Sequence, residues 1–164
     1  MQSHWRALTL GMVLVVGGVL GVDIVNLSAQ AGDPRMGTWK LNVAKSKYSP
    51  GPAPRSVTLK VEPSGQGEKV TAEFVNADGT RTTSQYTANF DGKDRPLTGS
   101  AVADTVSLKR IDARTTDRTD KKGGKVVQTL KRVVSQNGKT MTVTVKGTNA
   151  QGQAVNNVVV FDKQ

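Results

Sequence analysis

The sequence contains no cysteine, and its single histidine, His4, lies near the N-terminus. Beyond residue 31 the chain therefore offers neither a thiol nor an imidazole. Without these groups it cannot form a Ser-His-Asp or Cys-His nucleophile pair, or a zinc site with the usual ligands. The acidic residues Asp78, Asp91, Asp94, Asp120 and Glu68 are expected in turn-like stretches, where such residues usually bond their own backbone. We therefore expect a protein that is not an enzyme and needs no cofactor or metal.

Aromatic residues are also scarce, at 4% of the chain. Proteins that bind single-stranded nucleic acid stack bases on several aromatic side chains, so no specific nucleic-acid partner is expected. The formal net charge of +10 still favours anionic surfaces. Lipid head groups and acidic polysaccharides are the partners that such a surface attracts.

Long hydrophobic runs are absent except near the N-terminus, where residues 7–22 are uncharged. This run follows Arg6 and precedes the small residues Ala29-Gln30-Ala31, which is the order of a secretory signal peptide. It falls short of the roughly 20 residues of a spanning helix, although a membrane anchor is the alternative. We predict that residues 1–31 are a signal peptide cut after Ala31. Residues 32–164 are then one periplasmic or secreted domain, which is not an integral membrane protein.

In the rest of the chain the hydropathy of the residues alternates with a period of two. Apolar and polar residues alternate from Arg55 onward, as in Val57, Leu59 and Val61, and stretches such as Asn76-Ala77-Asp78-Gly79 interrupt them with turn residues. This pattern is typical of antiparallel strands joined by tight turns. It predicts about nine strands near residues 37–42, 56–62, 69–75, 80–90, 104–111, 113–120, 125–135, 139–147 and 154–162. The one helical candidate is a short turn near residues 43–48.

The links between these strands are short, which favours sequential neighbours in an up-and-down meander. Closure of such a sheet removes the unpaired edges that invite aggregation. We therefore predict an all-β fold: an antiparallel up-and-down meander of about 8–10 strands closed into a barrel, with little helix. Two stacked sheets are the alternative, and only residues 48–55 look long enough to connect them.

Several motifs resemble the lipocalin and fatty-acid-binding proteins of the calycin superfamily. Gly37-Thr38-Trp39 at the first strand is similar to their Gly-x-Trp motif, and residues 129–132, 138–141 and 158–163 resemble the last third of the fatty-acid-binding proteins. The layout is most similar to exported bacterial lipocalin-like domains. In this superfamily the motif Trp plugs the bottom of the barrel and a late-strand Arg packs over it. The resemblance implies that Trp39 is the plug and Arg132 its cover, with Arg110 as the second choice.

Two departures from the fatty-acid-binding proteins matter for function. Those proteins hold a carboxylate with an Arg-x-Tyr motif on the last strand, and the matching positions here are Val159 and Phe161. They also carry a lid of two helices, for which the stretch between Leu41 and Arg55 is too short. A fatty acid would therefore need another arrangement.

Many of the side chains expected to point inward are small, which favours a partly empty barrel. We predict a non-enzymatic barrel that binds a small apolar or amphipathic ligand, with Tyr86 as its main polar contact. The residues expected to line the site are Phe74, Tyr86, Phe90, Leu108, Met141 and Val143. The alternative is a filled barrel or sandwich that acts as a surface-binding or structural module for anionic lipid head groups or polysaccharide.

Overall fold

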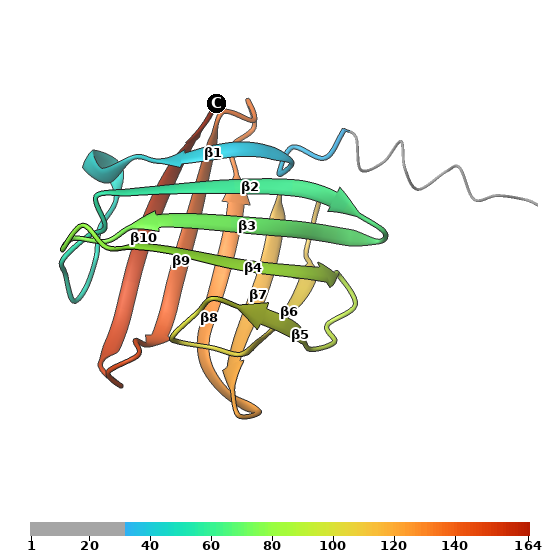
Figure 1. The fold of residues 1–164 in the computed structure, drawn as a ribbon. Coiled ribbons are helices and arrows are strands. Elements are labelled where there is room, and N and C mark those ends of the chain that lie inside the picture. Colours follow the sequence, from blue (N-terminus) through green and yellow to red (C-terminus); the bar gives the residue numbers. More distant parts are fainter. Residues whose placement is uncertain (1–31) are drawn as a thin grey trace, which may run out of the picture.

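The computed structural model of the protein describes residues 32–164, and the predicted signal peptide, residues 1–31, lies outside this part. The described chain forms ten strands and a single turn of 3-10 helix, η1 (Val43–Lys45) (Figure 1). The strands are β1 (Gly37–Leu41), β2 (Ser56–Ser64), β3 (Gly67–Val75), β4 (Arg81–Asn89), β5 (Arg95–Thr98), β6 (Thr105–Arg110), β7 (Thr115–Lys122), β8 (Lys125–Val134), β9 (Thr140–Thr148) and β10 (Ala154–Lys163).

The ten strands close into one antiparallel barrel in which each strand pairs with its neighbours in the chain. The first and last strands complete the ring, with Trp39 opposite Lys163 and Leu41 opposite Phe161. The predicted closed meander with little helix is therefore confirmed, and the stacked-sheet alternative does not hold. Closure gives every strand two partners, so the backbone groups that an edge strand would expose are paired.

Strand β5 is the element that the sequence pattern did not indicate. It has four residues and pairs with β4 only through Gln85 and Tyr86, and with β6 only through Val106 and Thr105. A strand this short shows too little alternation to be recognised, and its second residue, Pro96, has no N–H to donate to a ladder. The stretch was expected to be a connection between two strands.

The barrel is filled at the end where β1 begins and β10 ends. Trp39, Val61, Ala88, Val134 and Met141 are all buried there, and Trp39 and Met141 have no exposed surface. These residues come from five strands, and each occupies an inward position, because alternate side chains of a strand point to the same face. This part of the molecule is called the closed end below.

The five residues before β1 fold across the closed end. The Arg35 side chain is fully buried, and the Trp39 indole Nε1 donates a 2.9 Å hydrogen bond to the Arg35 carbonyl oxygen. Gly37 lies between them with φ of +120°, where a Cβ atom would also come within 3.1 Å of Lys163 Cε. A residue with a side chain would be strained here, which explains the glycine of the Gly-x-Trp motif.

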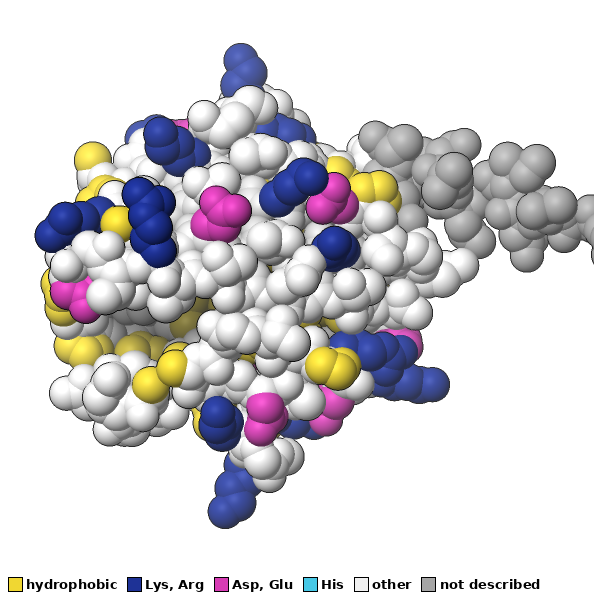
Figure 2. Space-filling model, in the orientation of Figure 1, with side chains coloured by type: hydrophobic (Ala, Val, Ile, Leu, Met, Phe, Trp, Pro, Cys, Tyr) yellow, Lys and Arg dark blue, Asp and Glu magenta, His cyan; other side chains and the backbone are white. Residues whose placement is uncertain are grey.

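The face of the barrel drawn in Figure 2 is largely polar, with Lys and Arg side chains spread over it and acidic side chains in between. No helix among residues 32–164 is long and apolar enough to cross a membrane.

Candidate binding cavity

The half of the barrel opposite the closed end contains a cavity of about 820 Å³. It opens between the β1–β2 connection, the β3–β4 turn and the β5–β6 connection, where Figure 2 shows a hollow with hydrophobic side chains around it. Residues at this mouth include Tyr48, Pro52, Pro54, Ala77 and Val102. The volume falls within the range of small-molecule sites, about 300–1,000 Å³.

The proline-containing connection between β1 and β2 is fastened to the barrel rather than free. The Ser49 backbone N–H donates to Asn157 Oδ1 at 2.8 Å, and the Asn156 N–H donates to the Ser49 carbonyl oxygen at 2.8 Å. Burial raises the pKa of Tyr48, which lies in the same connection, to about 12. This connection takes the place at which fatty-acid-binding proteins carry a lid of two helices, as the short spacing led us to expect.

Apolar side chains form one continuous side of the cavity. They come from inward positions of β2, β3, β9 and β10, which are neighbours around the barrel through β1. Most are Val, Leu or Ala, so they leave space that larger side chains would fill. The members of this wall are Val57, Leu59, Val70, Ala72, Phe74, Val143, Val145, Val159 and Phe161.

A buried ion pair lies at the floor of the cavity. Arg132 Nη2 on β8 donates to both carboxylate oxygens of Glu68 on β3, at 2.8 and 2.6 Å. The Tyr86 hydroxyl on β4 donates to Glu68 Oε1 at 2.8 Å. Burial, and after it the charge of Glu68, raises the pKa of Tyr86 well above its usual range, so the phenol stays protonated at neutral pH.

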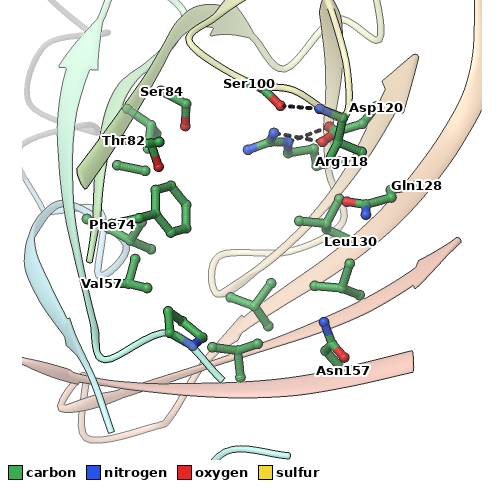
Figure 3. Close-up of a pocket in the computed structure, with 18 of the residues that line it drawn as sticks. Val57, Phe74, Thr82, Ser84, Ser100, Arg118, Asp120, Gln128, Leu130 and Asn157 are labelled. Atoms are coloured by element: carbon green, nitrogen blue, oxygen red, sulfur yellow. Dashed lines mark hydrogen bonds and ion pairs between the residues drawn. The ribbon is translucent and has the colours of Figure 1, made fainter. Parts of the chain in front are cut away.

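A second ion pair lies above the first, on β7. Arg118 Nε and Nη2 donate to the two oxygens of Asp120 at 2.5 and 2.8 Å, and the Arg118 guanidinium lies 4.8 Å from the centre of the Tyr86 ring. Burial alone lowers the pKa of Arg118, but the charge of Asp120 and the hydrogen bonds to it outweigh burial and raise the pKa. Figure 3 shows Arg118 and Asp120 side by side, with the guanidinium directed toward the centre of the cavity.

A third set of charges links the closed end to the cavity floor. Arg35 Nε donates to Asp33 Oδ1 at 2.8 Å, and its Nη1 donates to Thr116 Oγ1. Arg110 Nη2 donates to Asp33 Oδ2 at 2.8 Å. Burial by itself raises the pKa of Asp33, but the hydrogen bonds from Arg35 and the two guanidinium charges hold it below its usual value. Since Thr116 also lines the cavity, the N-terminal segment forms part of the floor support.

The six residues predicted to line a ligand site divide into two groups. Phe74, Tyr86, Leu108 and Val143 line the cavity. Met141 is fully buried at the closed end, and Phe90 packs there under two guanidinium groups, those of Arg35 at 4.8 Å and Arg110 at 4.5 Å. Neither Met141 nor Phe90 is among the residues that line the cavity. Whether a residue is at an odd or even position of its strand decides if its side chain points inward. It does not decide how far along the barrel axis that side chain lies.

The residues proposed for the barrel plug also separate. Trp39 is fully buried at the closed end, and the cation over its ring is Lys163, whose Nζ lies 5.1 Å from the ring centre. Arg132 instead pairs with Glu68 at the cavity floor, and Arg110 stacks on Phe90. The structural reason is the register: β1 pairs with β10, which places Lys163 directly beside Trp39.

Sequence reasoning overlooked the polar residues of the interior, above all Thr116 and Arg118. It also expected Glu68 and Asp120 in turns, which is wrong: they lie buried on β3 and β7. A signal for the β7 residues existed. Strand β7 has the sequence TTDRTDKK, which contains no apolar residue. In a closed barrel every strand presents alternate side chains to the interior, so this strand must direct polar groups inward. An amphipathic interior follows from that one segment once closure is assumed.

Within residues 32–164 no group of three or more acidic or histidine side chains is placed to hold a metal ion. No protein-family profile matches the chain, and no curated protein matches it in sequence. Among solved structures, the chain is similar to a zebrafish ileal bile acid-binding protein in complex with cholic acid, at 11% identity and a TM-score of 0.46. The match covers 80% of this chain and 99% of that one. The closed ten-strand antiparallel meander is the barrel architecture that the resemblance to the calycin superfamily implied.

Proposed function

We propose that this protein is a non-enzymatic barrel that binds one small apolar or amphipathic molecule in its open half. The observation that carries the proposal is the cavity of about 820 Å³, which combines a continuous apolar wall with a few polar groups. Such a combination is typical of small-molecule sites: apolar area supplies binding energy, and a few polar groups orient the ligand.

The chemistry of the lining favours binding over catalysis. Residues 32–164 contain no histidine or cysteine, so no imidazole or thiol reaches the cavity. The two buried carboxylates of the interior, Glu68 and Asp120, are each held by an arginine at 2.8 Å or less. A carboxylate whose two oxygens accept from a guanidinium has fewer lone pairs left to contact a substrate.

The guanidinium groups have donors left for a ligand. A guanidinium carries five N–H donors, and Asp120 accepts from only two Arg118 nitrogens. The Nε atom of Arg132 is buried without a hydrogen-bond partner among the described residues. A buried donor without a partner is costly, but this nitrogen has no accessible surface. The Arg118 side chain is 22% exposed, so its remaining donors are the ones that an acceptor oxygen on a ligand can reach. Because Arg118 and Arg132 are balanced by Asp120 and Glu68, a neutral hydroxyl or carbonyl serves as well as an anion.

Export is a further part of the proposal and rests on the sequence of residues 1–31. We propose that the protein works in the periplasm or outside the cell after cleavage following Ala31. Intact-mass measurement of protein secreted by its host tests this, since a mature chain should begin at Gly32. A chain that retains residue 1 would contradict it.

The surface-binding alternative assumed a filled interior, which the open half of the barrel is not. The basic exterior remains available for anionic lipid or polysaccharide surfaces, and we propose such contacts only as an accompaniment to interior binding. They should weaken strongly with salt, whereas binding inside a largely apolar cavity should not.

A cavity-filling variant tests the proposal directly. Ala72 is buried in the apolar wall, so Ala72→Phe should place a ring in the space that a ligand needs. We expect saturable binding of an apolar fluorescent dye to weaken by about tenfold or more, equivalent to about 1.4 kcal/mol. Thr71→Phe is the matched control, because Thr71, the neighbour of Ala72 on β3, points outward.

Native mass spectrometry of protein purified from its own host should in addition show a bound small molecule. Circular dichroism establishes that both variants are folded. Equal dye binding by Ala72→Phe and the unchanged protein would show that the dye binds elsewhere and would overturn the proposal.

A further inference from the structure

Polar and apolar side chains are segregated around the cavity, not along its axis. The apolar wall comes from β9, β10, β2 and β3, whereas the polar groups gather on β4 to β8. In Figure 3 Ser84, Thr82, Ser100, Arg118 and Asp120 occupy one side of the space, and Val57 lies on the opposite side. A molecule in this cavity therefore meets a different chemistry on each of its two long sides.

The first boundary between the two sides is the seam between β3 and β4. At three successive levels of the barrel an apolar residue on β3 stands beside a polar one on β4. These pairs are Phe74 with Thr82, Ala72 with Ser84 and Val70 with Tyr86. All six residues line the cavity, so the boundary runs along the full depth of the space.

Farther around the same polar side, β7 directs only polar residues inward, which are Thr116, Arg118 and Asp120 from floor to mouth. The second boundary lies between β8 and β9, where Arg132 stands beside Val143. The polar side is interrupted by Leu97, Leu108 and Leu130, and the apolar side by Asn157 near the mouth. A site for a ligand with one polar head would instead have polar groups at one level only.

Two hydroxyl groups on the polar side are free to bond a ligand. Neither Ser84 nor Thr82 makes a side-chain hydrogen bond with another described residue, and both line the cavity. They lie at the middle and upper levels, away from the ion pair at the floor. The cavity thus offers hydrogen-bonding groups beside the body of a ligand as well as at its end.

We infer that the ligand of this cavity is facially amphipathic, with an apolar face along one long edge and hydroxyl or other oxygen groups along the other. The inference rests on the proposed function, which it narrows. A simple head-and-tail lipid matches the apolar side but leaves Thr82, Ser84 and Arg118 facing its chain without partners. A molecule with oxygens spaced along one edge satisfies them.

A matched pair of probes separates the two ligand types. Stearate has a polar group at one end only, and 9,10-dihydroxystearate adds two hydroxyls at mid-chain with the same length and carboxylate. We expect the dihydroxy compound to displace a fluorescent dye with a Kd about 3- to 10-fold lower than that of stearate, the factor that one or two net hydrogen bonds supply.

The double variant Thr82→Val/Ser84→Ala removes the two free hydroxyls with little change in volume. It should raise the Kd of dihydroxystearate and leave that of stearate unchanged. Thr83→Val, which alters an outward-facing hydroxyl between the two, is the control and should change neither.

The outcomes distinguish this inference from the proposed function. Tighter binding of stearate than of dihydroxystearate, or an equal effect of the double variant on both, overturns the facial assignment while the binding barrel stands. Absence of dye, stearate and dihydroxystearate binding to folded protein overturns both.

Discussion

The closed end and the open half of this barrel are built from the same strands, yet one is filled and the other is hollow. At the closed end large side chains such as Trp39, Met141 and Arg35 meet with no exposed surface. In the open half, the same strands carry Ala72, Val145 and Leu59 at inward positions. Side-chain volume, not backbone architecture, therefore decides where a ligand fits.

The two regions also use charge differently. The closed end buries Asp33 and Arg35 beneath the barrel as part of the packing, whereas the cavity floor buries Glu68 and Arg132 with one guanidinium nitrogen still lacking a partner. A buried ion pair thus serves as packing at the closed end, whereas the pair at the floor leaves one donor without a partner inside the barrel. The following predictions test that contrast.

The largest effect is expected from breaking the pair at the floor. Glu68→Gln leaves the Arg132 charge buried without a counter-charge, which should lower the free energy of unfolding by about 3–5 kcal/mol in urea denaturation. The double variant Glu68→Gln/Arg132→Met removes both charges and should regain much of the loss. A single variant as stable as the unchanged protein would show that the floor is open to water.

Truncation of apolar side chains should separate the filled end from the hollow half. Met141→Ala creates a new cavity in a packed region and should cost about 2–5 kcal/mol of unfolding free energy. Leu130→Ala enlarges a space that already exists and should cost only about 1–1.5 kcal/mol. Thermal or urea denaturation measures both. Equal losses would contradict the division of the barrel into two regions.

Asp33 should make stability at the closed end depend on pH. Its pKa in the folded protein lies below the usual value, so its contribution is complete above the unfolded pKa of about 4 and is lost as the pH falls through the folded value. We expect Asp33→Asn to cost about 1–3 kcal/mol at pH 7, as for hydrogen bonds to charged groups. Urea denaturation between pH 7 and pH 2 should show a shallower acid loss in this variant. An unchanged pH profile would exclude Asp33 as its source.

The smallest effect is expected from Lys163, which lies over the Trp39 ring at the closed end. Lys163→Met keeps the side-chain stem and removes the ammonium group that lies 5.1 Å from the Trp39 ring centre. A cation–π contact at an exposed position contributes about 0.5–1 kcal/mol, and the loss should be of that size in urea denaturation. A loss above that of Met141→Ala would mean that Lys163 has a further structural role.

Much of the fold could be predicted because it depends on local patterns. The alternation in residues such as Val57, Leu59 and Val61, with glycine-containing turns at short intervals, is enough to predict a closed meander. The placement of Phe90 and Met141 could not be predicted in this way. Alternation shows which face a residue joins, but its level along the barrel depends on the stagger of all ten strands.

The sequence alone excluded imidazole and thiol chemistry from residues 32–164 and set the alternation from which a closed sheet follows. It also contained the strand TTDRTDKK, whose alternate side chains had to place polar groups in the barrel interior. These are local or compositional properties. Only the tertiary structure decided that Glu68 meets Arg132 across 64 positions and that Arg35 reaches Thr116 across 81. Such pairings depend on strand register and on the space that neighbouring side chains leave, and neither is written in any short segment of the chain.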